Sequence, residues 1–193
     1  MARWMLIAGL ALCCAVGMAL AEEGETVESP TVIMTTSLGE IVIELDPGKA
    51  PITVENFLQY VDDEHYDGTV FHRVIKQFMI QGGGFDADMA QKPNRDPIKN
   101  EANNRLPNDT YTIAMARTQI VDSATSQFFI NTKNNASLNF RSADPRGYGY
   151  CVFGKVIEGQ DVVDKIEGVA TGNKGRFQNV PVETVTIESV RRK

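Results

Sequence analysis

The sequence predicts a mainly β protein, and two observations favour a closed antiparallel barrel. After residue 30 the chain divides into short segments rich in β-branched and aromatic residues, bounded by turn residues such as Pro47-Gly48. Two segments, far apart in the chain, instead show the helical spacing of apolar residues. Many short strands with few helices are typical of β-barrels. The chain has no internal repeat, low-complexity tract or interdomain linker, so we expect one domain.

Six segments outside the centre of the chain are expected to be strands. In residues 40–45, Ile41, Ile43 and Leu45 alternate with two glutamates and a valine, which predicts one buried and one solvated face. The complete set of these expected strands is 31–36, 40–45, 112–116, 128–131, 150–157 and 184–190.

A hairpin is expected at the centre of the chain. Two apolar runs, Val70–Ile75 and Phe78–Gln81, are joined at Lys76-Gln77 and followed by three glycines. Arg73 lies inside the first run. A guanidinium among apolar residues keeps its charge and needs partners, so Arg73 is either a structural residue that bonds backbone carbonyls or a functional one.

Two helices are expected, one before the central hairpin and one directly after the strand at residues 150–157. The first begins at Pro51 and ends near His65, and its apolar residues fall at i, i+3, i+4 and i+7 from Val54. The second spans residues 159–168 and ends at a capping glycine. Between them, residues 82–108 lose periodicity, and so long a loop in a compact domain is more often functional than idle.

The first 21 residues have the pattern of a secretory signal peptide. Arg3 supplies a positive charge, residues 4–16 are apolar, and Ala19-Leu20-Ala21 offers a small-x-small cleavage site. An uncleaved anchor is the alternative, but the apolar run is short for a membrane span. We therefore expect a signal peptide at residues 1–21, a flexible leader at 22–30 and the folded domain at 31–193.

Composition restricts the partners and the chemistry. Loss of Arg3 with the signal peptide leaves 18 basic and 25 acidic residues, a net charge of about −7, which argues against nucleic acid and anionic membranes as partners. Cys151 would be the one remaining cysteine, expected to be a buried and inert thiol. With two histidines and no paired cysteines, we expect neither a metal site nor a cofactor.

Four motifs resemble the cyclophilin family of peptidyl-prolyl cis/trans isomerases. They are FHRVIKQFMIQGG, IAMAR, SQFFIN and YCVFGKV, and they occur in the family's order between residues 31 and 190. The stretch IKNEANNRLPNDTYTIAMART looks most like the bacterial periplasmic cyclophilins. The resemblance implies a closed eight-stranded antiparallel barrel with an α-helix covering each end. It also implies catalysis on the outer surface. The signal-peptide pattern makes the periplasm the expected place of action, with the cell exterior as the second choice.

The resemblance also assigns the site residues. Arg73 and Gln81 would be catalytic, with Gln81 orienting Arg73. The residues implied to bind substrate are Phe78, Met79, Ala116, Arg117, Gln127, Phe129, Leu138 and Tyr150. Strict strand alternation puts Phe78 and Gln81 on opposite faces, so a β-bulge is expected in the hairpin. His72 should point away from the site and have a structural or supporting role.

The expected function is acceleration of X-Pro isomerisation during the folding of exported proteins. Unfolded or newly exported polypeptides would be the partners, and the protein would act as a monomer. Ser137 aligns where cyclosporin-binding relatives carry tryptophan, which predicts weak cyclosporin binding. Two alternatives are a non-catalytic chaperone of the same fold that holds proline segments, and a barrel that carries a small hydrophobic ligand. A buried arginine has no use in a mere binder, which favours the enzyme.

Overall fold

The computed structural model of the 193-residue chain describes Met1 and residues 29–193. Residues 2–21 of the predicted signal peptide and residues 22–28 of the predicted leader lie outside the described residues. In the part that is described, no helix is both long enough and apolar enough to cross a membrane.

Nine strands form one sheet of antiparallel pairs, in the order β3-β11-β1-β2-β8-β6-β7-β5-β4. The strands are β1 (Thr31–Thr36), β2 (Gly39–Leu45), β3 (Thr69–Val70), β4 (Arg73–Ile75), β5 (Met79–Gly82), β6 (Thr112–Met115), β7 (Phe128–Asn131), β8 (Val152–Glu158) and β11 (Thr186–Arg192). A separate hairpin consists of β9 (Thr171–Lys174) and β10 (Phe177–Pro181). The prediction of a mainly β fold with two helices is therefore confirmed.

The strand count differs from the expected eight because Val70–Ile75 is not one strand. The chain pairs with β11 through β3, and the next backbone N–H, of Phe71, donates at 3.0 Å to the carbonyl of Val185, directly before β11. It then crosses at His72 and pairs with β5 as β4. Thus β3 and β4 are the two edges of the curled sheet. In the described residues no hydrogen-bonded ladder joins these edges, which are linked by the chain at Phe71 and His72.

The register of the sheet sorts side chains into an inner and an outer row. In the inner row Val74 of β4 pairs with Ile80, Ile80 with Ile130, and Ile130 with Ile113. All four are at most 1% exposed. Because successive residues of a strand point to opposite faces, the next row along lies on the outside.

Helix α1 (Pro51–Asp62) packs its apolar stripe into the core. Its N-terminus has no local side-chain cap; instead the carboxylate of Glu101, from the long loop, accepts hydrogen bonds from the Ile52 and Thr53 amides at 3.2 and 2.8 Å. Such capping of the first free amides is worth about 1 kcal/mol. The helix ends three residues before His65, the predicted end, in a turn closed by Gly68.

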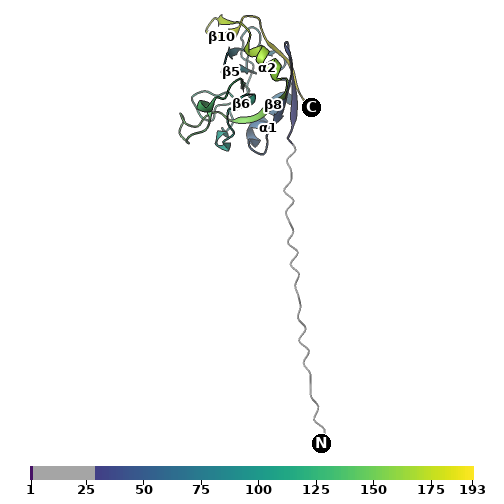
Figure 1. Cartoon of the computed structure of the whole chain (residues 1–193), viewed down its shortest axis with the longest axis vertical. Coiled ribbons are helices and arrows are strands. Elements are labelled where there is room, and N and C mark those ends of the chain that lie inside the picture. The colour runs from purple at the N-terminus through teal and green to yellow at the C-terminus, as the bar shows by residue number, and fades with distance from the viewer. Residues whose placement is uncertain (2–28) are drawn as a thin grey trace.

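Helix α2 (Gln160–Glu167) buries Val162, Val163 and Ile166 as expected. Its last residue, Glu167, accepts a hydrogen bond at 2.6 Å from the backbone N–H of Gln77 in the β4–β5 turn. Figure 1 shows the two helices on opposite sides of the strands, with α2 beside β5 and α1 below β8. The second helix therefore anchors the turn of the central hairpin.

Aromatic rings fill the centre of the core. Phe57 of α1 lies 5.1 Å from Tyr66, 5.9 Å from Phe128 and 5.2 Å from Phe153 between ring centroids. Tilted and edge-on pairs of this kind contribute about 0.5–1.5 kcal/mol each beyond area burial. The centre of the sheet is therefore packed with side chains, and a ligand site must lie on its outer face.

Three further expectations need correction. The β4–β5 pairing runs in register from Arg73 to Ile75, so the expected β-bulge is absent there. Tyr150 was expected within a strand, but β8 begins at Val152. The β9–β10 hairpin was not predicted. By contrast, residues 83–101 form no helix or named strand, and the long irregular loop is confirmed.

Candidate active site

A row of outward-facing residues crosses four strands beside the core. Arg73 of β4 pairs with Gln81 of β5, Gln81 pairs with Phe129 of β7, and Phe129 pairs with Ala114 of β6. Directly opposed residues on one face of a sheet lie within side-chain contact distance. The register alone therefore brings an arginine, a glutamine and a phenylalanine together.

Arg73 and Gln81 are linked through their side chains. Arg73 Nη1 donates to Gln81 Oε1 at 3.3 Å, and Gln81 Nε2 donates to Gln127 Oε1 at 3.1 Å. The Arg73 side chain is half-buried and has no described carboxylate within 4.0 Å. Its charge is thus oriented by a neutral amide, and the guanidinium keeps donors for another acceptor.

An apolar hollow of about 120 Å³ opens beside Arg73. Phe129 and Met79, 4% and 2% exposed, belong to the apolar cluster at its floor. Tyr150 stands edge-on to Phe129 with ring centroids 5.6 Å apart. The complete lining is Arg73, Phe78, Met79, Gln81, Ala116, Arg117, Phe129, Leu138 and Tyr150. Every predicted site residue except Gln127 lines this one hollow.

Phe78 reaches the hollow from a turn rather than from a strand. The β4–β5 turn closes with the Phe78 amide donating to the Ile75 carbonyl at 3.1 Å, and β5 begins one residue later. Gln77 adopts a left-handed φ of 58°. Because Phe78 precedes the strand, alternation does not apply to it, and no bulge is needed to bring it to the same side as Gln81.

Gln127 lines an adjoining groove of about 290 Å³ that shares Gln81, Ala116 and Arg117 with the hollow. The predicted neighbouring groove is therefore present in the geometry. A Cβ on Gly84 would approach the Gln127 side chain to 2.4 Å. The third glycine of the central motif thus leaves the space that Gln127 occupies.

Arg117 borders both depressions. It donates from Nε to the Gly149 carbonyl at 2.8 Å and from Nη1 to the Thr118 carbonyl at 2.9 Å. Its guanidinium carbon lies 4.9 Å from the centroid of the Tyr150 ring. The cation–π contact and hydrogen bonds to backbone carbonyls fix the orientation of this arginine beside the hollow.

A buried asparagine network supports the hollow, and sequence reasoning missed it. Asn135 Nδ2 donates to the Phe78 carbonyl at 2.7 Å and to Asn131 Oδ1 at 2.8 Å. Asn108 Nδ2 donates to the Leu138 carbonyl at 3.2 Å. Asparagine is common in loops, so the sequence signal was only the local density of asparagines at 131–139.

His72 lies away from the hollow, as expected from alternation. It is 5% exposed and its ring packs against Phe85 with centroids 4.8 Å apart. Burial is the main cause that lowers its pKa to about 4. At neutral pH this histidine is therefore an uncharged packing group behind β4.

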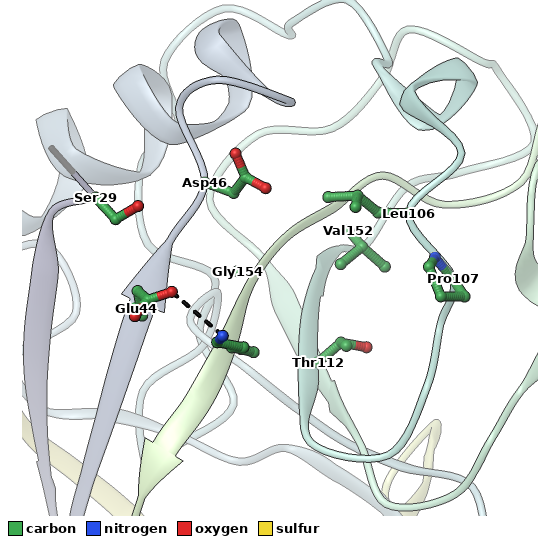
Figure 2. A pocket seen from close by; sticks show the side chains of 9 residues that line it. Ser29, Glu44, Asp46, Leu106, Pro107, Thr112, Val152 and Gly154 are labelled. Atoms are coloured by element: carbon green, nitrogen blue, oxygen red, sulfur yellow. Dashed lines mark ion pairs between the residues drawn. The ribbon is translucent and has the colours of Figure 1, made fainter. Parts of the chain in front are cut away.

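A second hollow, of about 230 Å³, lies on the same outer face between β2 and the loop at Leu106 (Figure 2). Lys155 and Glu44 form an ion pair of 3.4 Å across its lower edge. Leu106 and Val152 line it and also belong to the apolar cluster that contains Phe129. None of the predicted site residues lines it.

Comparison with known proteins now identifies the family. The family model described as cyclophilin type peptidyl-prolyl cis-trans isomerase/CLD matches residues 31–192. The chain belongs to the cyclophilin family. The resemblance seen in the four sequence motifs is thereby confirmed, and the protein is a peptidyl-prolyl cis-trans isomerase.

Bacterial cyclophilins are among the similar proteins. Peptidyl-prolyl cis-trans isomerase cyp18 of Streptomyces antibioticus is 62% identical over 161 residues, covering 83% of this chain and 97% of the relative. Peptidyl-prolyl cis-trans isomerase B of Escherichia coli is 57% identical over 159 residues, covering 82% and 97%. The chain therefore matches these relatives over nearly their whole length.

Solved cyclophilins share the fold. The crystal structure of a cyclophilin type isomerase from Cryptosporidium parvum gives a TM-score of 0.70 at 25% identity and covers 86% of this chain and 98% of that one. A second structure of that protein, in the presence of the dipeptide Ala-Pro, gives a TM-score of 0.69 at 25% identity and covers 84% and 98%.

Proposed function

We propose that Arg73 accelerates prolyl isomerisation by donating a hydrogen bond to the prolyl nitrogen as the X-Pro amide twists. Planarity of the amide sets a barrier of ~18–20 kcal/mol. In the twisted amide the nitrogen regains its lone pair, so a donor aimed at it binds this state better than either planar isomer. Only such differential binding accelerates the reaction.

The single observation that carries this proposal is the guanidinium of Arg73 at the edge of an apolar hollow, oriented by Gln81. A charge-assisted hydrogen bond contributes roughly 1.5–3 kcal/mol, or about one to two decades of rate. The remaining acceleration is assigned to holding the flanking peptide in place while the bond turns and to excluding water.

The other lining residues would bind the substrate. Phe129, Met79 and Phe78 offer an apolar recess suited to a proline ring, closed by Leu138 and Tyr150. Gln127, Ala116 and Arg117 border the adjoining groove, where the neighbouring peptide backbone would lie.

The biological clients would be unfolded or newly exported polypeptides that contain X-Pro bonds, handled in the periplasm by a monomer. Support comes from the signal-peptide pattern of residues 1–21 and from the likeness to bacterial cyclophilins. Expression of the full chain with its leader in a Gram-negative host tests this. The expected result is a periplasmic protein whose mass corresponds to a start near Glu22. A cytoplasmic protein that retains Trp4 would contradict the proposed localisation.

A non-catalytic chaperone that holds proline segments is the second candidate function in the cell. Refolding assays separate the two roles. The mature chain at catalytic amounts should accelerate a refolding phase limited by prolyl isomerisation, and should leave unchanged the refolding of a matched protein variant that lacks the critical proline. Suppression of aggregation at equimolar amounts, without acceleration of the slow phase, would favour the chaperone role.

A further inference from the structure

A third depression adjoins the apolar hollow and differs from it in charge. We call it the basic recess; it has a volume of about 650 Å³ and is lined by Arg117, Thr118, Gln119, Pro145, Arg146 and Tyr150. Arg117 and Tyr150 are also walls of the apolar hollow. The basic recess therefore adjoins the position that a bound proline would occupy, on the other side of Arg117 and Tyr150.

Arg117 presents unsatisfied positive charge to the basic recess. Its three described hydrogen bonds go to backbone carbonyls, those of Gly149, Thr118 and Pro145. A guanidinium has five N–H donors, so two remain. The carbonyls and the Tyr150 ring fix its orientation but do not neutralise it.

Arg146 is an exposed wall of the basic recess, without a described carboxylate within 4.0 Å of its guanidinium. The nearest acidic residue in the chain, Asp144, is engaged within its own turn. Its carboxylate accepts hydrogen bonds from the Arg146 and Gly147 amides, both at 3.0 Å, and from the Ser142 hydroxyl. Asp144 offsets part of the local charge but is not a wall of the basic recess.

Three arginines elsewhere in the described domain are paired with carboxylates, whereas Arg117 and Arg146 are not. Arg95, Arg191 and Arg192 each form an ion pair with an aspartate. In a protein with a formal net charge of −6, a depression walled by two arginines and no carboxylate stands out beside the apolar hollow.

We propose that the basic recess selects client segments that carry an acidic side chain within two residues of the proline. The two depressions share walls, and two residues of extended chain span only about 7 Å. A glutamate or aspartate reaching Arg117 and Arg146 would form an exposed ion pair, which predicts about a two- to fivefold gain. This inference rests on the proposed binding of proline in the apolar hollow.

The test uses short peptides with one X-Pro bond, in which Glu, Gln or Lys is placed in turn at one of four positions, the two residues before the proline or the two residues after it. NMR exchange spectroscopy gives kcat/KM, and chemical-shift titration gives Kd, at about 20 mM and 500 mM salt. At low salt we expect Glu to exceed Gln about two- to fivefold at one position at least, with Lys below Gln. The preference should fade at high salt, where the Debye length falls to a few Å.

Two charge-matched variants locate the effect. Arg146→Gln should reduce the Glu-to-Gln ratio toward one. Arg176→Gln removes the same charge from an exposed residue of the β9–β10 hairpin and should retain the ratio. Equal kcat/KM and equal Kd for Glu and Gln peptides at all four positions at low salt would overturn the proposal, and so would equal loss of the ratio in both variants.

A failure of the proposed acidic preference can be distinguished from a failure of the proposed Arg73 mechanism. If Arg73 were not the donor, neutral peptides would be turned over normally by Arg73→Ala, and the Glu-to-Gln ratio would be unchanged. If turnover of every peptide failed, the Kd ratio would still decide whether the basic recess recognises an acidic side chain.

Discussion

Arg73 and Gln81 face each other across the β4–β5 pair, and a hydrogen bond of 3.3 Å joins Arg73 Nη1 to Gln81 Oε1. The same glutamine is opposed by Phe129 on its other side and donates to Gln127. Gln81 therefore connects the proposed donor with both the apolar hollow and the adjoining groove.

If Gln81 acts by orienting Arg73, its replacement should matter only while Arg73 is present. Gln81→Leu should lower kcat/KM about tenfold, the low end for a charge-assisted hydrogen bond of this length. In an Arg73→Ala background the same replacement should have little further effect. The measurement is a double-mutant cycle by NMR exchange on one neutral peptide. Additive losses in the double variant would show that the two residues act independently.

Cyclosporin should inhibit the enzyme weakly. Ser137 is an exposed residue of the short 3₁₀ turn Ala136–Leu138, directly before Leu138 of the apolar hollow. A serine there supplies neither the apolar wall nor the N–H donor of a tryptophan. Loss of such a contact costs on the order of 1.5–3 kcal/mol, or about one to two decades of affinity. Inhibition titrations should show this, and Ser137→Trp should increase inhibition. Nanomolar inhibition of the natural protein would contradict the prediction.

The Cys151 thiol should be unreactive in the folded protein. It is buried, and burial is the main cause that raises its pKa to about 12. Since an unperturbed thiol has a pKa of about 8.5, the thiolate fraction at pH 8 should fall by more than about a thousandfold on folding. Reaction with a thiol reagent should be slow in buffer and fast in denaturant. Rapid labelling of the native protein would show that the thiol is accessible.

His72 should make the protein less stable in acid. Its pKa is about 4 in the folded state and about 6.5 when unfolded, so the unfolded chain binds the proton first. The stability that comes from keeping His72 uncharged is fully present above about pH 6.5 and is lost as the pH falls toward 4. Urea unfolding of the natural protein and His72→Gln at several pH values measures this. The difference in unfolding free energy between the two proteins should change with pH in this window. The carboxylates are the same in both proteins, so their titration cancels in this difference. A constant difference would contradict a buried neutral His72.

Most of the candidate site could be predicted because its residues, except Leu138, lie in four short motifs of known order. Their geometry could not, because it depends on where strands begin. Phe78 belongs to a turn in which Gln77 has a left-handed φ of 58°, and alternation counted through that turn gives the wrong face. The expected β-bulge is not needed, because Phe78 lies in the turn and reaches the same side of the sheet as Gln81 without it.

The β9–β10 hairpin and the asparagine network show why local patterns were insufficient elsewhere. The hairpin is mostly polar and exposed, and it packs on the domain through Phe177, whose ring lies 5.2 Å from that of Phe85. Asn135 holds a carbonyl 57 residues away in the chain. In both cases the stabilising partner is distant in sequence, so neither periodicity nor propensity indicates the structure.

The most direct test of the mechanism is the turnover of Arg73→Ala and Arg73→Lys on one neutral X-Pro peptide. NMR exchange gives kcat/KM, and circular dichroism with urea unfolding confirms that each variant is folded. We expect kcat/KM of Arg73→Ala to fall at least about tenfold, because the variant lacks a charge-assisted hydrogen bond to the twisted amide. Arg73→Lys should not recover the loss, because a flexible ammonium lacks the planar fork that Gln81 orients. Near-natural kcat/KM in folded Arg73→Ala would contradict the account.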